Sequence, residues 1–243
     1  MKKAAVSCLD ALFAAIAAQQ KLYLPADDAA GQAHFTLWQA GMKLSARLNT
    51  VRSAKDLFFP QVENLMGFRV SGKQIEELET RDEVSPFVLF GVRACDARSF
   101  DILDRVFLSA PADTFYQARR ENATVISLAC TRPEETCFCQ SFGVDAADPA
   151  GDVTCWLDET ALYWRANTEK GRALTEALPM LEEGGEEAVS AQQEKTRAIL
   201  DRLPLRTLSL NGFGAGKTKA LFDRPEWKQL SESCLGCGTC TFV

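Results

Sequence analysis

The chain has 243 residues, of which 47% are hydrophobic and 25% are charged, and this globular composition argues against disorder as its main state. Its net charge of −6 argues against a nucleic-acid-binding surface, and no apolar run approaches the roughly 20 residues that a membrane-spanning helix needs. Because the chain has one histidine, His34, a multi-histidine metal site and a Ser–His–Asp triad are both disfavoured. The chain also has nine cysteines.

An amphipathic helix is predicted near the N-terminus, where apolar residues recur at helical spacing. These residues are Val6, Leu9, Leu12, Phe13 and Ile16. Asp10 interrupts the apolar stretch, which favours a helix of the folded protein over a secretory signal. The cysteine spacings C-x-x-C-x-x-C and C-x-C suit metal thiolates in a reducing compartment better than disulfides, so a cytoplasmic protein is expected.

A βαβ unit is predicted in the middle of the chain. The apolar runs at residues 87–92 and 123–129 are typical of buried strands, and Asp96 is a candidate N-cap for a helix between them. The inner face of this helix would carry Phe100, Leu103 and Phe107. A strand, a helix and a strand of this length place the two strands parallel. The expected fold class is therefore α/β, or α+β.

The remaining elements are expected to complete an N-terminal mixed α/β domain over residues 1–203. Further strands are predicted at residues 21–25, 34–38, 154–157 and 161–166, and further helices at residues 113–120, 168–178 and 186–203. A connector is expected at residues 204–224. Within it, residues 211–218 resemble a phosphate-binding loop, but Asn211 stands where that motif requires glycine. A flexible connector is therefore favoured over a nucleotide site.

Residues 225–243 are expected to begin a ferredoxin-like domain, because Cys234, Cys237 and Cys240 form a C-x-x-C-x-x-C run. This spacing is typical of three thiolates around one face of a [4Fe–4S] cluster, and the glycines of the run let the backbone approach the sulfurs. The bacterial ferredoxin pattern would place its next cysteine just beyond the last residue, so we expect a chain truncated inside this domain. A zinc-knuckle half-site and a chance spacing are the alternative interpretations.

A second group of cysteines lies inside the α/β domain. Cys95 follows the first buried strand and Cys130 the second, so parallel strands would bring both to the carboxyl edge of the sheet, where α/β proteins place their sites. Cys137 and Cys139 lie in the next loop, within reach. Four thiolates suit a [4Fe–4S] cluster or a zinc ion, and the spacing lacks the paired C-x-x-C hooks of structural zinc. The cluster is favoured, and buried inert cysteines are a third interpretation.

The other cysteines and the nearby arginines have simpler interpretations. Cys8 and Cys155 are expected to be core residues. Four arginines lie close in sequence to the internal cysteines and could offset the charge of a cluster, although a solvated face or a surface ion pair is the favoured explanation for each one. They are Arg93, Arg98, Arg119 and Arg120.

Several distinctive motifs occur together in this chain. They are F-G-V-R-A-C-D-A-R at residues 90–98, Y-Q-A-R-R-E-N at 116–122, L-A-C at 128–130, T-C-F-C at 136–139 and K-D-L-F-F-P at 55–60. With Trp227 ahead of the final C-L-G-C-G, they resemble a family of iron–sulfur subunits that includes the A subunit of anaerobic sulfite reductase and the beta subunit of sulfhydrogenase. The resemblance covers residues 55–143 and the C-terminal end.

The resemblance implies an α/β domain followed by a ferredoxin-like domain with two [4Fe–4S] clusters. Residues at matching positions are Cys95, Cys130, Cys137 and Cys139 for an additional cluster, and Cys234, Cys237 and Cys240 for the ferredoxin-like domain. It further implies a non-catalytic subunit that relays electrons between the catalytic subunit of a sulfite reductase or sulfhydrogenase and a flavin- and NAD(P)-binding subunit. The alternatives are a zinc-stabilised interaction or scaffold module and a nucleotide-dependent enzyme that uses Lys217.

Overall fold

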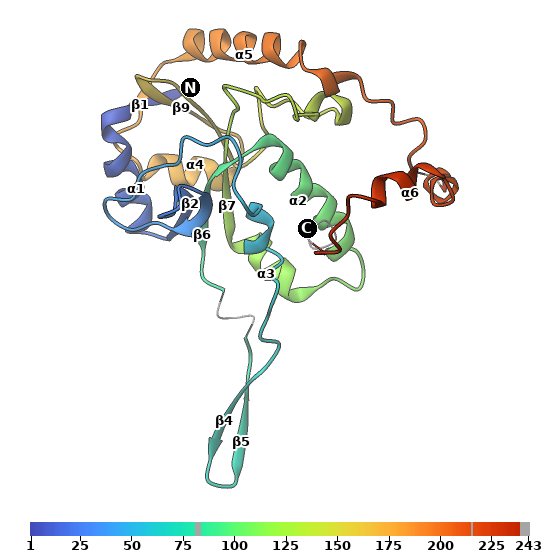
Figure 1. Cartoon of the computed structure of the whole chain (residues 1–243). Coiled ribbons are helices and arrows are strands. Elements are labelled where there is room, and N and C mark those ends of the chain that lie inside the picture. The colour runs from blue at the N-terminus through green and yellow to red at the C-terminus, as the bar shows by residue number, and fades with distance from the viewer. Residues whose placement is uncertain (81–83, 215, 239–243) are drawn as a thin grey trace. The chain divides into compact units, whose positions relative to one another are not determined.

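The computed structural model describes residues 1–80, 84–214 and 216–238 (Figure 1). The chain forms two compact units, Met1–Arg206 and Thr207–Val243. The first unit combines a large sheet with several helices, so the predicted α/β class is confirmed. Within the described ranges, no helix combines the length and the apolar character that a membrane crossing requires.

An eight-stranded mixed sheet with the order β10-β1-β9-β8-β7-β6-β2-β3 is the centre of the first unit. Its strands are β1 (Lys2–Ala5), β2 (Lys21–Asp27), β3 (Ala33–Leu37), β6 (Phe87–Val92), β7 (Ala123–Leu128), β8 (Val153–Leu157), β9 (Ala161–Ala166) and β10 (Glu182–Glu183). The neighbours β2, β6, β7 and β8 run parallel, and the other pairs are antiparallel. The predicted parallel βαβ unit is therefore confirmed, and the predicted strands β8 and β9 form an antiparallel hairpin.

Helices cover both faces of this sheet (Figure 1). The α-helices of the unit are α1 (Leu9–Ala17), α2 (Ala94–Phe107), α3 (Thr114–Asn122), α4 (Glu169–Glu176) and α5 (Glu186–Leu200). Its 3-10 helices are η1 (Val6–Cys8), η2 (Ala54–Leu57), η4 (Cys139–Phe142) and η5 (Pro204–Thr207). The last residue of η5 belongs to the second unit. On one face Phe13 of α1 and Leu174 of α4 pack with Phe90 of the sheet. On the other face Phe100 of α2 and Tyr116 of α3 are buried. Each such side chain contributes about 1.5–3 kcal/mol when it leaves water.

A β-bulge near the end of β6 changes which face its side chains point to. Val88 and Phe90 belong to one core, but Val92 belongs to the opposite core with Leu89. A regular strand would keep Phe90 and Val92 on the same face, because side chains alternate with a period of two. The register with β7 shifts between these two residues, and Gly91 has a φ of 88°. A Cβ atom on Gly91 would lie 2.9 Å from Cδ of Pro25, so the bulge requires glycine.

The predicted start of helix α2 is wrong by three residues. The N-cap is Arg93 rather than Asp96, and the backbone N–H of Ala97 already donates to the carbonyl of Arg93 at 2.9 Å. The Asp96 carboxylate instead accepts a hydrogen bond of 2.6 Å from the hydroxyl of Ser53. This long-range bond takes the place of the capping bond, and Cys95 consequently lies inside the first turn of the helix.

Four strands of the structure have no counterpart among the predicted elements. β1 pairs with β9 and β10 at one edge of the large sheet, and β4 (Gly67–Ser71) and β5 (Gln74–Leu78) form a separate antiparallel pair. The paired apolar residues Val70 and Ile75 of this hairpin are 66% and 70% exposed. Because none of these strands has an apolar run of its own, the sequence pattern offered no signal for them.

Candidate metal centre

The four internal cysteines lie at the carboxyl edge of the parallel strands. Cys95 is in the first turn of α2, which directly follows β6, and Cys130 lies two residues beyond β7. Cys137 and Cys139 follow in the loop after β7. Cys130, Cys137 and Cys139 share one apolar cluster with Ala94, the neighbour of Cys95. The structure therefore brings all four residues to the same edge of the sheet.

The thiols of this group are close enough to influence one another electrostatically. Burial raises the pKa of Cys130 to about 12, the charge of Arg93 opposes this rise, and Cys95, Cys139 and Cys137 add to it. Burial, followed by Cys95 and Cys137, raises the pKa of Cys139 to about 11. Both groups are therefore protonated at neutral pH in the absence of a cation, and metal binding would have to displace their protons.

Helix α5 holds the cysteine loop in place. The hydroxyl of Thr196, which is 1% exposed, donates a 2.8 Å hydrogen bond to the carbonyl of Cys130. The amide of Gln140 donates a bond of the same length to the carboxylate of Asp201, one residue beyond α5. These contacts join positions more than 60 residues apart, so no local sequence pattern indicates that Thr196 supports the site.

The backbone also donates to sulfur in this loop. The N–H of Glu134 lies 3.3 Å from Sγ of Cys137, and the N–H of Cys137 donates at 2.9 Å to the carbonyl of Glu134. The loop closes at Gly143, whose φ of 67° is a left-handed conformation that glycine adopts without strain. Hydrogen bonds to a sulfur are one of the means by which a protein tunes a metal–thiolate centre.

Two kinds of metal centre, a single zinc ion and an iron–sulfur cube, make different demands on four thiols. Among the residues that the structure describes, no three His, Cys, Asp or Glu side chains are grouped tightly enough to hold a single ion. A zinc ion with Zn–S bonds of about 2.3 Å would require its sulfurs within about 4 Å of one another. An iron–sulfur cube binds each thiolate at a separate iron corner, so its sulfur ligands lie farther apart than those of a single ion. The donor type of the group, four thiols, fits the cube.

The C-terminal cysteines belong to the second unit. This unit contains η6 (Lys217–Leu221) and α6 (Glu226–Ser231). Cys234 and Cys237 are exposed, and Cys240 lies outside the described residues. Gly236 has a φ of 67°, and its N–H lies 3.4 Å from Sγ of Cys234. The glycine between the first two cysteines therefore lets the backbone turn around a sulfur, as the spacing predicted.

Four other residues that could bind a metal or a ligand, Cys8, His34, Cys155 and Lys217, lie outside the four-cysteine group. Cys155 is fully buried in β8, and Cys8 is partly buried at the N-cap of α1. Nε2 of His34 lies 3.3 Å from the carboxylate of Asp28. In the glycine-rich segment, the amino group of Lys217 is 3.4 Å from the carbonyl of Asn211. None of these residues belongs to the four-cysteine group.

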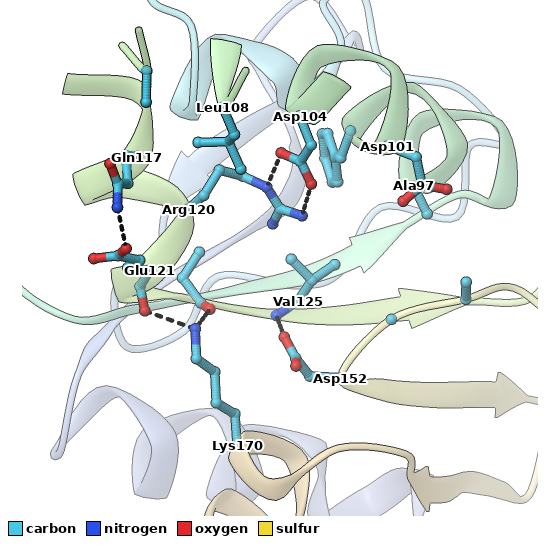
Figure 2. Close-up of a pocket in the computed structure, with 15 residues that line it drawn as sticks. Ala97, Asp101, Asp104, Leu108, Gln117, Arg120, Glu121, Val125, Asp152 and Lys170 are labelled. Carbon is cyan, nitrogen blue, oxygen red and sulfur yellow. Dashed lines mark hydrogen bonds and ion pairs between the residues drawn. The ribbon is translucent and has the colours of Figure 1, made fainter. Parts of the chain in front are cut away.

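A hollow of about 510 Å³ lies at the amino edge of β7, opposite the cysteines (Figure 2). Figure 2 shows that Arg120 faces Asp104, while Lys170 and Asp152 turn toward the backbone. Arg120 donates two 2.8 Å bonds to Asp104, and Lys170 donates to the carbonyls of Glu121 and Ala123 at 2.6 and 3.0 Å. These contacts join α2, α3 and α4 to the start of β7, so they serve the fold.

We expect Asp104→Asn to lower the free energy of unfolding by about 2 kcal/mol at neutral pH. Burial opposes ionisation of Asp104, but hydrogen bonds from Arg120 and Tyr116 outweigh it and lower the pKa of this carboxyl. A lowered pKa stabilises the fold above the ordinary pKa of the carboxyl, and this contribution disappears as pH falls through the folded value. The difference in unfolding free energy between wild type and variant, measured by urea unfolding, should therefore narrow as pH falls below the ordinary pKa of the carboxyl.

Asp101→Asn is the matched control for this prediction. Asp101 pairs with Arg98 on the same helix, but it is 54% exposed, and exposed pairs of this kind contribute little. We expect a change below about 0.5 kcal/mol with no trend in pH. If Asp104→Asn behaved like this control at every pH, the Asp104–Arg120 pair would not stabilise the fold.

One curated protein is similar to this chain over most of its length. The chain is 35% identical over 180 residues to Sulfhydrogenase 2 subunit beta of Pyrococcus furiosus. The match covers 72% of the chain and 51% of that protein, so the chain spans about half the length of its relative. No protein-family model matches the chain, and no solved structure matches it significantly.

Proposed function

Because the chain belongs to the sulfhydrogenase beta-subunit family, we propose that it is an iron–sulfur subunit that relays electrons within an oxidoreductase complex. Its partners would be a catalytic subunit of the hydrogenase or reductase type and a flavin- and NAD(P)-binding subunit. The internal cysteines would hold one [4Fe–4S] cluster, and the C-terminal run would contribute to a ferredoxin-type cluster. Those ligands are Cys95, Cys130, Cys137 and Cys139, and Cys234, Cys237 and Cys240. We propose a cytoplasmic location from the cysteine spacing.

The observation that carries this proposal is the convergence of four thiols on one edge of the sheet. They come from α2, from the end of β7 and from the loop after it, yet they influence one another electrostatically. Structural disulfides do not explain the group, because all four are free thiols. Four thiolates at the corners of one site are the usual ligand set of a [4Fe–4S] cluster.

In such a site the cluster and the protein chain have different roles. When it is bound, the cluster supplies one-electron chemistry. The chain supplies the sulfur ligands, and it buries Cys130 to 8% exposure, which limits the access of water. Backbone donors such as the N–H of Glu134 then help to set the potential.

The test is metal analysis of protein that is purified without oxygen, together with its visible spectrum. We expect Cys234→Ser/Cys237→Ser, which removes two of the three thiols of the C-terminal run, to retain about four iron and four acid-labile sulfide per chain with broad visible absorption. If that variant is empty as purified, reconstitution with iron and sulfide should give the same counts. About one zinc without sulfide would contradict the proposal and support the scaffold alternative. Failure of reconstitution would also contradict it.

A further inference from the structure

Arg93 is held at the edge of the sheet by backbone carbonyls. Its guanidinium donates to Leu48 at 3.0 Å, to Ala129 at 3.1 Å, and to Leu128 and Arg47 at 3.3 Å. Four acceptors from two separate segments fix the position of the group, because the planar guanidinium presents its donors in a rigid fork. The side chain therefore has one defined place in the fold.

The charge of Arg93 has no carboxylate partner in the described parts of the chain, since no ion pair joins it to an acidic side chain there. The other three arginines singled out in the sequence are each paired. Arg98 pairs with Asp101, Arg119 with Glu63 and Arg120 with Asp104. Carbonyl dipoles hold a guanidinium but carry no net charge, so the positive charge of Arg93 is not neutralised.

This charge lies between the two strand ends that carry the cysteines. Arg93 precedes Cys95 by two residues, and two of its acceptors, Leu128 and Ala129, directly precede Cys130. Its side chain is only partly exposed, which reduces screening by solvent. The remaining acceptors come from the loop at residues 47–48, so the arginine joins this loop to the cysteine edge.

We propose that Arg93 is the charge-compensating residue of the internal cluster and raises its reduction potential. This inference rests on the function proposed above. A cube bound by four thiolates is negatively charged, and reduction adds one more electron. A fixed positive charge at this edge stabilises the reduced form more than the oxidised form. In a titration the electron comes from the added reductant dithionite, and no bond of the chain is formed or broken.

The experiment is a potentiometric titration, followed by electron paramagnetic resonance, in the Cys234→Ser/Cys237→Ser background. We expect Arg93→Gln to reduce the equilibrium constant for reduction about tenfold, which is about 59 mV for one electron. Arg93→Lys keeps the charge, so its constant should stay within about threefold of the parent even though lost carbonyl contacts lower its melting temperature. Arg98→Gln removes a charge that is exposed and paired, and it is the matched control.

Two outcomes would overturn this inference. The first is an Arg93→Gln variant with full iron and sulfide whose potential changes no more than that of Arg98→Gln. The second applies if Arg93→Gln does not fold. In that case, a tenfold fall in the equilibrium constant for reduction of Arg93→Lys would show that the geometry of the side chain, and not its charge, sets the potential. Both presuppose that the parent binds iron and sulfide. A parent that binds neither would instead contradict the proposed function.

Discussion

Replacing Cys130 with alanine is expected to abolish the internal cluster while leaving the fold intact. The variant in the Cys234→Ser/Cys237→Ser background should lose about four iron and four sulfide per chain, together with its visible absorption. Cys130 is the most buried member of the group, at 8% exposure, so no water or exposed side chain can replace its thiolate from solvent. Alanine is small and apolar, and it suits the cluster of Ala94, Ala146 and Leu200 around this position. Metal analysis and circular dichroism would check the two parts of the prediction.

Cys155→Ala is the matched control for the cysteine prediction. Cys155 is also a free thiol and is fully buried, and it pairs with Leu128 on the neighbouring strand. It lies outside the four-cysteine group, so its replacement should cost about 1 kcal/mol of stability through lost packing and leave the iron content unchanged. If Cys130→Ala contained as much iron as the parent, Cys130 would not be a ligand. If Cys155→Ala lost iron as well, the iron content would reflect loss of stability and not loss of a ligand.

The second large effect is expected from Gly171→Ala, which should lower the free energy of unfolding by about 3 kcal/mol. Alanine is favoured over glycine by about 1 kcal/mol inside a helix, so helix propensity alone predicts that the substitution raises the free energy of unfolding. A Cβ atom on Gly171 would lie 2.1 Å from the carbonyl oxygen of Asp152. That oxygen already accepts the N–H groups of Asn167 at 2.8 Å and Thr168 at 3.3 Å, so it cannot move without breaking these bonds. Helix α4 would have to shift away from the start of β8.

Urea unfolding of Gly171→Ala beside Arg172→Ala would test this prediction. Arg172 is the next residue of α4 and its side chain is 56% exposed, so the same alanine faces solvent there. We expect the control to change stability by less than about 0.5 kcal/mol. A Gly171→Ala protein as stable as the parent would mean that α4 does not pack against Asp152 as described.

The sequence predicted the centre of the fold well, because its strands are continuous apolar runs. Residues 87–92 and 123–129 are buried in a parallel sheet, where both faces are covered and alternation is lost. Parallel pairing alone then places Cys95 and Cys130 at one edge. The strand β1, second from one edge, was not predicted because Lys2 and Lys3 carry no strand pattern, and their partners on β9 are more than 150 residues away.

What surrounds the cysteines depends on contacts between distant segments, which local pattern does not report. Asp96 has the chemistry of an N-cap, but the hydroxyl of Ser53, 43 residues earlier, engages it instead. A solvated face or a surface ion pair was the favoured explanation for Arg93, which is instead held by four carbonyls. Thr196 belongs to no distinctive motif and supports the carbonyl of Cys130. Each of these roles follows from tertiary structure.

The bulge at Gly91 determines which face of the sheet the residues between it and Cys95 point to. A strand of the same length without the bulge would restore strict alternation and move Val92 to the face of Phe90. Arg93 would rotate with it, away from the carbonyls that now hold it. Side chains in this stretch can therefore be exchanged, but loss of the bulge, or a one-residue change of length between the bulge and Cys95, would turn the residues before Cys95 to the opposite face.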